Sequence, residues 1–346
     1  MIVPEGMTLK LDPKDEFQHE PEAARNYNES MYFDMFDRTQ PLGAWLRIGN
    51  RPNEGHAEVT VCVHLPDGRV AFWFVRPEIS GNAELNAGGL RVEVVEPFKA
   101  LRIAYDGEVL LLDDANALKD ARNAFRHSPR AQASIRFDLT GVSPMHGGEI
   151  VNADGTPWDL DPETSSYRGH TEQHLAVTGQ ITIGDKSYAF DGFGFRDKSW
   201  GPRHWGNLHW HKWLPITFGP DFGALLALMG RRDQPPLIVG HVWRGDRLIP
   251  LTDARLDVRY DEDFVQQTMT LELETEDGTT TVVGETLAFT PLQHRRQTEN
   301  GGETRVRIIK TMTRFQCEGR QALGMAEFLD LIEDGRPISI TQLGHD

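Results

Sequence analysis

The stretch DGFGFRDKSWGPRHWGNLHWHKW, residues 191–213, combines aromatic, ionisable and glycine residues more densely than any other part of the chain. It carries four of the eight tryptophans, three histidines, an Arg-Asp pair and a second arginine. Side chains of these kinds transfer protons, hold charge and contact apolar ligands. We therefore expect a mostly β protein that encloses an apolar cavity, with this stretch supplying most of the polar chemistry inside it.

The segments around this stretch have the pattern of short strands joined by tight turns. Residues 57–64 and 69–75 are β-rich runs on either side of Leu-Pro-Asp-Gly, a turn sequence, and predict a hairpin. Residues 172–183 and 187–195 predict a second hairpin, which leads directly into the central stretch. Repeated strands with 33 glycines and 20 prolines are typical of a β-sandwich or β-barrel. The predicted fold class is all-β.

The length of the chain, 346 residues, favours two domains, because a single hydrophobic core rarely grows this large. Residues 1–25 are polar and spaced by prolines, and we expect them to form an arm on the surface. We expect a first β domain over 26–168 and a second over 169–346, which carries the central stretch. Residues 115–126 predict a short helix, and residues 144–167 a long loop that could cover a cavity or link the domains.

Composition excludes several classes of partner. The formal charge of −16 opposes binding to nucleic acid or to an anionic membrane. No apolar run approaches the length of a membrane helix and no secretory signal is visible, so we expect a cytoplasmic protein without membrane insertion. Cys62 and Cys317 are too few for a disulfide framework. A monomer and a homodimer fit the sequence equally well.

Two sets of side chains alternate along predicted strands, so each set shares one face. These sets are His170, Glu172 and His174, and His209, His211 and Trp213. Turned into one cavity, the two faces could form a proton-transfer site or a site in which histidines and a carboxylate bind a metal. Spacing does not assign a third metal ligand, and our prediction is a site without metal.

The residues around Trp200 allow a structural and a functional interpretation. In the first, an Arg-carboxylate pair locks a turn, Trp200 fills the core and Gly201 supplies an unusual backbone dihedral. In the second, Asp197 projects into an apolar pocket, where burial raises its pKa and makes it a general acid. Arg196 and Arg203 oppose the second interpretation by stabilising the carboxylate, so the direction in which Arg196 points decides between them.

Aromatic side chains suit an isoprenoid or polycyclic ligand and would stabilise a developing carbocation. The candidate substrate-binding residues are Trp210, Trp213, Trp200, Trp205, Phe195, His174 and Trp73. Core packing is the alternative interpretation for all of these aromatic residues. The chain has no glycine-rich dinucleotide or phosphate motif, no nucleophile elbow and no CxxC motif, so we predict no cofactor.

The segment FGFRDKSWGPRHW, residues 193–205, resembles the signature of the AttH-like and hydroxyneurosporene synthase (carotenoid 1,2-hydratase) superfamily of lipocalin-like proteins. Residues 29–37 (ESMYFDMFD), 170–181 (HTEQHLAVTGQI) and 324–330 (GMAEFLD) resemble its two-domain branch. The resemblance implies two consecutive lipocalin-like β-barrels or sandwiches with few short helices. It also implies a hydrophobic ligand site inside or between them, and chemistry without a redox cofactor.

The family signature falls on identifiable positions of this chain. They are Arg196, Asp197, Ser199, Trp200, Gly201 and Arg203. Lys198 departs from the family pattern, which usually has histidine there. If that histidine transfers protons in the family, His204, His209 or His211 would replace it here, because strand alternation turns residue 198 away from Asp197.

These observations lead to a hydratase, dehydratase or isomerase that acts by acid-base chemistry on a small hydrophobic isoprenoid-derived alkene or alcohol. Asp197 or Glu172 would protonate the substrate, and His209 or His211 would transfer the second proton. Trp210 and Trp213 would shield the cationic intermediate. One alternative is a binding protein for lipids or terpenoids without catalysis, and others are a cyclase and a metal-dependent enzyme of the HxH type.

Overall fold

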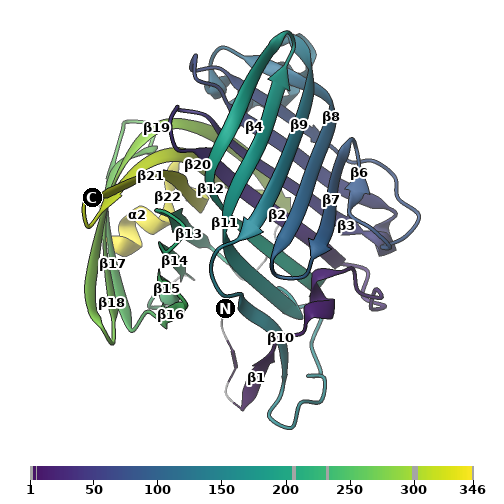
Figure 1. Ribbon diagram of the computed structural model, residues 1–346, viewed down its shortest axis with the longest axis vertical. Helices are drawn as coiled ribbons and strands as arrows, with labels where there is room; N and C mark the ends of the chain where they lie inside the picture. The colour runs from purple at the N-terminus through teal and green to yellow at the C-terminus, as the bar shows by residue number, and fades with distance from the viewer. Residues whose placement is uncertain (1–2, 5, 205–207, 231–233, 298–302, 345–346) are drawn as a thin grey trace. The chain divides into compact units, whose positions relative to one another are not determined.

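The computed structural model describes residues 3–4, 6–204, 208–230, 234–297 and 303–344. These residues form two antiparallel β sheets, one of 12 strands and one of 10, with only short helices (Figure 1). The predicted all-β class with few helices is confirmed. The chain divides into two compact units, and each sheet belongs to one of them.

The first unit comprises Met1–Leu65, Val70–Leu111 and Pro129–Gly206. Its strands are β1 (Met7–Lys10), β2 (Tyr27–Asp37), β3 (Gly43–Arg51), β4 (His56–His64), β5 (Val70–Val75), β6 (Asn86–Ala87), β7 (Leu90–Glu96), β8 (Ala100–Leu112), β9 (Arg130–Gly141), β10 (His146–Asn152), β11 (Gly169–Ile183) and β12 (Lys186–Pro202). Two 3-10 helices, η1 (Pro13–Glu16) and η2 (Pro52–Glu54), accompany them.

Eight strands of the first unit close into a barrel. Their order is β9-β11-β12-β2-β3-β4-β5-β8, and β8 pairs back with β9. Alternate residues of each strand point inward. On β2, for example, Met31, Phe33 and Met35 join the apolar core of the barrel, while Tyr32 and Asp34 lie on the outer face. Packed apolar side chains therefore occupy the barrel interior.

The second unit comprises Pro66–Arg69, Leu112–Ser128 and Asn207–Asp346. Its strands are β13 (Trp210–Thr217), β14 (Phe222–Gly230), β15 (Leu237–Arg244), β16 (Arg247–Pro250), β17 (Asp253–Tyr260), β18 (Gln266–Thr275), β19 (Gly278–Gln297), β20 (Glu303–Cys317), β21 (Arg320–Glu333) and β22 (Arg336–Pro337). Its helices are η3 (Ala115–Asp120), α1 (Ala121–His127) and α2 (Ile338–Leu343). Its sheet curls around a separate apolar core.

The division between the units differs from the expected boundary at residue 169. Strand β11 pairs with β9, and β12 pairs with β2, so the hairpin over 169–202 completes the first barrel. Without this hairpin the barrel would have two open edges, each with unpaired backbone groups. The predicted start of the second domain at residue 169 is therefore corrected to a division after residue 206.

The N-terminal arm is also corrected, because part of it is buried. Glu16 is fully buried, and its two carboxylate oxygens accept hydrogen bonds of 2.9 and 2.7 Å from Arg196 Nη1. The backbone N–H of Phe98 donates a third, at 2.9 Å. Lys198 Nζ donates to Phe17 O at 3.1 Å and to Glu29 Oε1 at 2.6 Å. Residues 12–24, the N-terminal strap, are thus held to the barrel by buried charges.

His19 and Trp200 complete this attachment. The two rings stack with their centroids 4.4 Å apart. His19 Nδ1 lies 2.8 Å from Glu29 Oε1, and the Lys198 ammonium lies 4.7 Å from the centre of the Trp200 ring. Arg196, Lys198 and Trp200 alternate along β12 and therefore share one face, on which each contacts the strap or Glu29. These three signature residues serve the structure of the barrel.

No helix among the described residues has both the length and the apolar character needed to cross a bilayer.

We predict that Glu16→Gln destabilises the protein by about 3–5 kcal/mol, because it leaves the buried Arg196 charge uncompensated. Urea denaturation measures the loss. The exposed pair of Arg38 and Asp191 supplies the control, since Asp191→Asn is expected to cost less than about 1 kcal/mol. Equal losses in the two variants would contradict a stabilising role for the buried pair.

We also predict a pH dependence that comes from Glu29. Burial alone would raise the pKa of Glu29, but Lys198 and His19 outweigh it and lower the pKa from 4.5 to about 2. This carboxylate therefore stabilises the folded state above pH 4.5, and its contribution, roughly 3 kcal/mol, is lost as the pH falls towards 2. Denaturation at several pH values should show this loss in wild type and not in Glu29→Gln. The control variant Asp138→Asn, which changes an exposed carboxylate, should lose stability at low pH in the same way as wild type.

Candidate functional site

The outer face of the β11–β12 hairpin gathers the ionisable residues of the candidate site. The register places Glu172 opposite Asp197 and His170 opposite Ser199. Residues opposite each other in an antiparallel pair point to the same side. The predicted clustering of His170 and Glu172 on one face is confirmed, and Asp197 joins them.

His170 and Asp197 make the closest polar contact of the site. His170 Nε2 lies 2.5 Å from Asp197 Oδ2, and one ligand atom of each of His170, Glu172 and Asp197 lies within 4.8 Å of the others. The side chains of His170 and Asp197 are 16% and 22% exposed, whereas Glu172 is buried. The Tyr167 ring stacks on His170 at 5.2 Å. The hairpin thus holds a partly open histidine-carboxylate pair.

The surroundings of this pair favour the charged forms of both residues, whereas the sequence had suggested a neutral Asp197 acid. Burial tends to lower the pKa of His170, but the carboxylates of Asp197 and Glu172 outweigh it and raise the pKa. Burial tends to raise the pKa of Asp197, but His170 outweighs it and, with a smaller contribution from Arg203, lowers the pKa. The predicted rise in the pKa of Asp197 is therefore corrected: the group suited to donate a proton is the His170 imidazolium.

Arg196 and Arg203 take different positions, which answers the question left open by the sequence. Arg196 points into the barrel and pairs with Glu16, not with Asp197. Arg203 Nη1 donates to Ser199 Oγ at 2.5 Å, beside Asp197. Burial lowers the pKa of Arg203 to about 10, and the guanidinium keeps its charge at neutral pH. Of the two arginines, Arg203 rather than Arg196 is therefore the one whose charge acts on Asp197.

Two further histidines lie next to the pair. His146, the first residue of β10, is opposite Glu172 in the register. His174 is fully buried and contacts Phe195 edge to face, with ring centroids 4.8 Å apart. Burial lowers the pKa of each of these histidines to about 3, so both are neutral at physiological pH. Sequence analysis missed His146, because its segment was expected to be a loop.

Aromatic side chains continue across the same outer face. Tyr32 is the β2 partner of Asp197, and Trp45 and Phe72 follow on β3 and β5. The rings of Tyr32 and Trp45 are 6.4 Å apart, and those of Trp45 and Phe72 are 6.2 Å apart. These rings are buried, and they rather than the tryptophans of the central stretch supply the apolar surroundings of Asp197 on β2, β3 and β5.

The predicted aromatic residues are dispersed by the fold. Trp200 packs inside the first barrel against the N-terminal strap. Trp73 packs against the first core, with the Arg130 guanidinium 5.4 Å from its ring centre. Trp210 belongs to the second core, Trp213 is buried on β13, and Trp205 lies outside the described residues. Of the predicted substrate-binding residues, Phe195 and His174 share the face of Asp197.

His209 and His211 belong to the second unit. His211 is part of β13, and the backbone of His209 bonds to Gly230 and Leu331. Lys212, which separates His211 from Trp213 in the sequence, is buried, and its ammonium group donates a hydrogen bond to Asp330 at 2.6 Å. The predicted cooperation of these histidines with Asp197 stays a prediction.

The arrangement of one imidazole and two carboxylates is also one that can hold a divalent cation. His170 Nε2 and Asp197 Oδ2 bond to each other, however, and a metal would have to replace that bond. The described geometry fits proton transfer without rearrangement.

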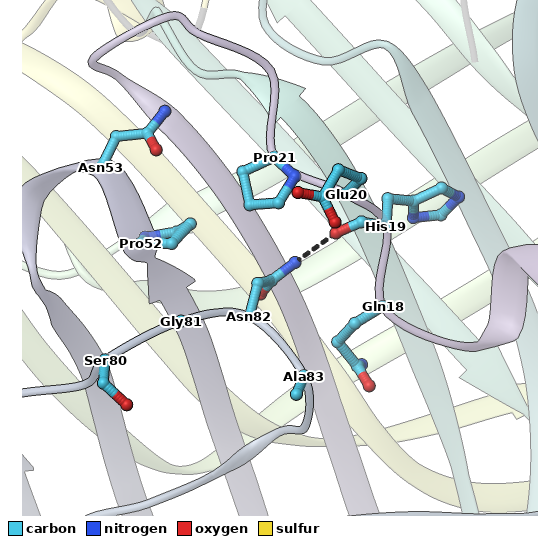
Figure 2. A pocket seen from close by; sticks show the side chains of 10 residues that line it. All are labelled: Gln18, His19, Glu20, Pro21, Pro52, Asn53, Ser80, Gly81, Asn82 and Ala83. Carbon is cyan, nitrogen blue, oxygen red and sulfur yellow. Dashed lines mark hydrogen bonds between the residues drawn. The ribbon is translucent and has the colours of Figure 1, made fainter.

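A separate pocket of about 530 Å³ lies beside the N-terminal strap (Figure 2). It is lined by Gln18, His19, Glu20, Pro21, Pro52, Asn53, Ser80, Gly81, Asn82 and Ala83. Asn82 Nδ2 donates to His19 O at 2.9 Å and ties the pocket wall to the strap. This lining is polar, unlike the apolar cavity predicted from the sequence.

We predict that Asp197→Asn lowers the pKa of His170, because it removes the closest negative charge. Nuclear magnetic resonance titration of the imidazole carbon-bound protons measures the change. Asp138→Asn, an exposed substitution in the same unit, should leave the His170 titration unchanged. An unaltered His170 titration in Asp197→Asn would show that the hydrogen bond is not an ion pair.

Comparisons with known proteins support the fold. A protein of Nitrosomonas europaea assigned as an AttH has a similar crystal structure, with 12% identity, a TM-score of 0.51 and coverage of 94% of this chain and 98% of that one. Kievitone hydratase from Nectria haematococca is also similar, with 9% identity, a TM-score of 0.51 and coverage of 95% and 97%. The predicted resemblance to AttH-like proteins is confirmed for the fold. The more specific resemblance, to the hydroxyneurosporene synthases and to the two-domain branch of the superfamily, stays a prediction.

Among curated proteins, none matches this sequence. Residues 12–332 match a family described as a domain of unknown function, DUF7064. This match covers the N-terminal strap, most of both sheets and the outer face that carries His170 and Asp197. The chain therefore belongs to the DUF7064 family.

Proposed function

We propose that the protein is a hydratase or dehydratase that works by acid-base chemistry on a small hydrophobic isoprenoid-derived alkene or alcohol. The observation that carries the proposal is the 2.5 Å hydrogen bond between His170 Nε2 and Asp197 Oδ2 on a partly exposed face. An imidazolium stabilised by a carboxylate is a suitable general acid, because histidine exchanges its proton in the physiological pH range.

The proton donor in this proposal is the second ring nitrogen of His170, Nδ1. Asp197 keeps its negative charge and stabilises the imidazolium through Nε2, as a carboxylate orients the histidine of a catalytic triad. In hydration, Nδ1 protonates one carbon of the double bond and a cation forms on the other. Dehydration runs these steps backwards, so neutral Nδ1 takes the proton from the carbon beside the cation after the hydroxyl group has left as water. His170 thus takes the role that the sequence had suggested for Asp197 or Glu172.

The neighbouring rings suit the intermediate. Tyr32, Trp45 and Phe72 extend from Asp197 along the outer face, and the negative π-faces of such rings stabilise a cation. Their burial next to Asp197 makes the surroundings of the pair apolar, which suits a hydrophobic substrate. The name of kievitone hydratase, a protein of similar fold, agrees with the reaction class, and the substrate class rests on the chemistry of this face.

Exchange of oxygen between substrate and water tests the proposal. Linalool and longer prenyl alcohols, incubated with the protein in oxygen-18 water, should gain the heavy isotope, because loss and re-addition of water replaces the hydroxyl oxygen. Mass spectrometry measures the gain. His170→Gln and Asp197→Asn should each slow the exchange by about 10²- to 10⁴-fold, and Asp138→Asn should not.

Equal exchange in wild type and His170→Gln would contradict the proposed acid. Binding of the alcohols without exchange would instead support a ligand carrier. An isomerase would show deuterium from heavy water in the carbon skeleton without oxygen exchange.

A further inference from the structure

We propose that His146 is the proton acceptor that works with His170, and that Glu172 returns the proton from one histidine to the other. The inference rests on the proposed function and adds to it the base that activates water. Sequence analysis had assigned this role to His209 or His211, which lie in the second unit.

Strand pairing brings the required groups together. His146 on β10 is the register partner of Glu172 on β11, and Glu172 is the partner of Asp197 on β12. Side chains opposite each other on neighbouring strands have Cβ atoms about 4.5–5.5 Å apart. Glu172 therefore lies between His146 on one side and Asp197 on the other, and it also lies next to His170.

The backbone after His146 fixes where this side chain leaves the sheet. Gly147 and Gly148 have φ values of 100° and 145°, which side chains other than glycine rarely adopt. A Cβ atom on Gly148 would lie 2.5 Å from the Lys10 carbonyl oxygen of β1. The backbone of this segment is thus packed closely between β1 and β11, which fixes the position from which the His146 side chain projects.

The two histidines differ in charge because their surroundings differ. His170 contacts the Asp197 carboxylate directly, and Glu172 is close to both. His146 is half-buried, and burial is the largest cause that lowers its pKa, to about 3; the charge of His170 is a smaller one. Other groups near the pair are His174 and Arg203, beside Asp197. Neighbouring groups whose pKa values are pushed apart in this way commonly act as the acid and the base of one reaction.

The proton steps balance for hydration. His170 Nδ1–H breaks as the new carbon–hydrogen bond forms, which leaves neutral His170 and a carbocation. Water adds to the cation through its oxygen, and its surplus proton goes to neutral His146. The His146 imidazolium then passes this proton to the Glu172 carboxylate, which passes it to His170. The sum is alkene plus water to alcohol, with both histidines restored; dehydration runs the same steps backwards.

Nuclear magnetic resonance of protein labelled with nitrogen-15 histidine tests the charge arrangement without any substrate. At neutral pH we expect the two ring nitrogens of His170 to be protonated and His146 to be neutral. A protonated His146 at neutral pH would overturn the inference, whether or not the protein exchanges oxygen. This result and a failure of the proposed function are therefore distinguishable.

Oxygen exchange of linalool tests the catalytic role. His146→Gln should lower kcat by about 10²- to 10⁴-fold with little change in KM, and added imidazole should restore part of the rate in His146→Ala. His127→Gln, a substitution of an exposed histidine on α1, is the control and should behave as wild type. A wild-type rate in His146→Gln would overturn the inference, as would the absence of imidazole rescue in folded His146→Ala.

Discussion

Alternation of side chains along β12 is the constraint on which both the stability of the first barrel and its candidate site depend. Arg196 and Lys198 point inward and meet the carboxylates of Glu16 and Glu29, while Asp197 points outward and meets His170. A shift of one residue in the pairing of β12 would exchange the two sets. It would leave two cations on the outer face and a carboxylate in the apolar core, so the ion pairs and the site enforce the same register.

The buried ion pairs explain how a barrel can hold charge in its interior. Removing a charge from water costs several kcal/mol, which only a close partner and further hydrogen bonds offset. Glu16 meets this condition through Arg196 and the Phe98 N–H, and Glu29 through Lys198 and His19. The charged groups inside the barrel therefore stabilise the fold, and the candidate proton-transfer groups lie on the outer face. There His170 and Asp197 keep partial access to solvent on two rigid, fully paired strands.

The sequence predicted what depends on local pattern. It predicted the all-β class from the strand-and-turn pattern, and strand alternation predicted the shared face of His170 and Glu172 and the turn of residue 198 away from Asp197. It did not predict what depends on distant pairing. The burial of Glu16 needs Arg196, 180 residues away, and the place of His146 needs β10 to pair with β11. The pKa of Asp197 was expected to rise because its true neighbour, His170, was not yet known.

The central claim is that substrate chemistry takes place on the outer face of the first barrel, at His170. A crystal structure of the protein soaked with a prenyl alcohol tests it most directly, because it locates the reacting group. The account predicts the hydroxyl oxygen within about 2.6–3.2 Å of a His146 ring nitrogen, the adjacent carbon beside His170 Nδ1, and the hydrocarbon chain towards Tyr32. An alcohol bound in the polar pocket beside the N-terminal strap, or only within the second unit, would contradict it.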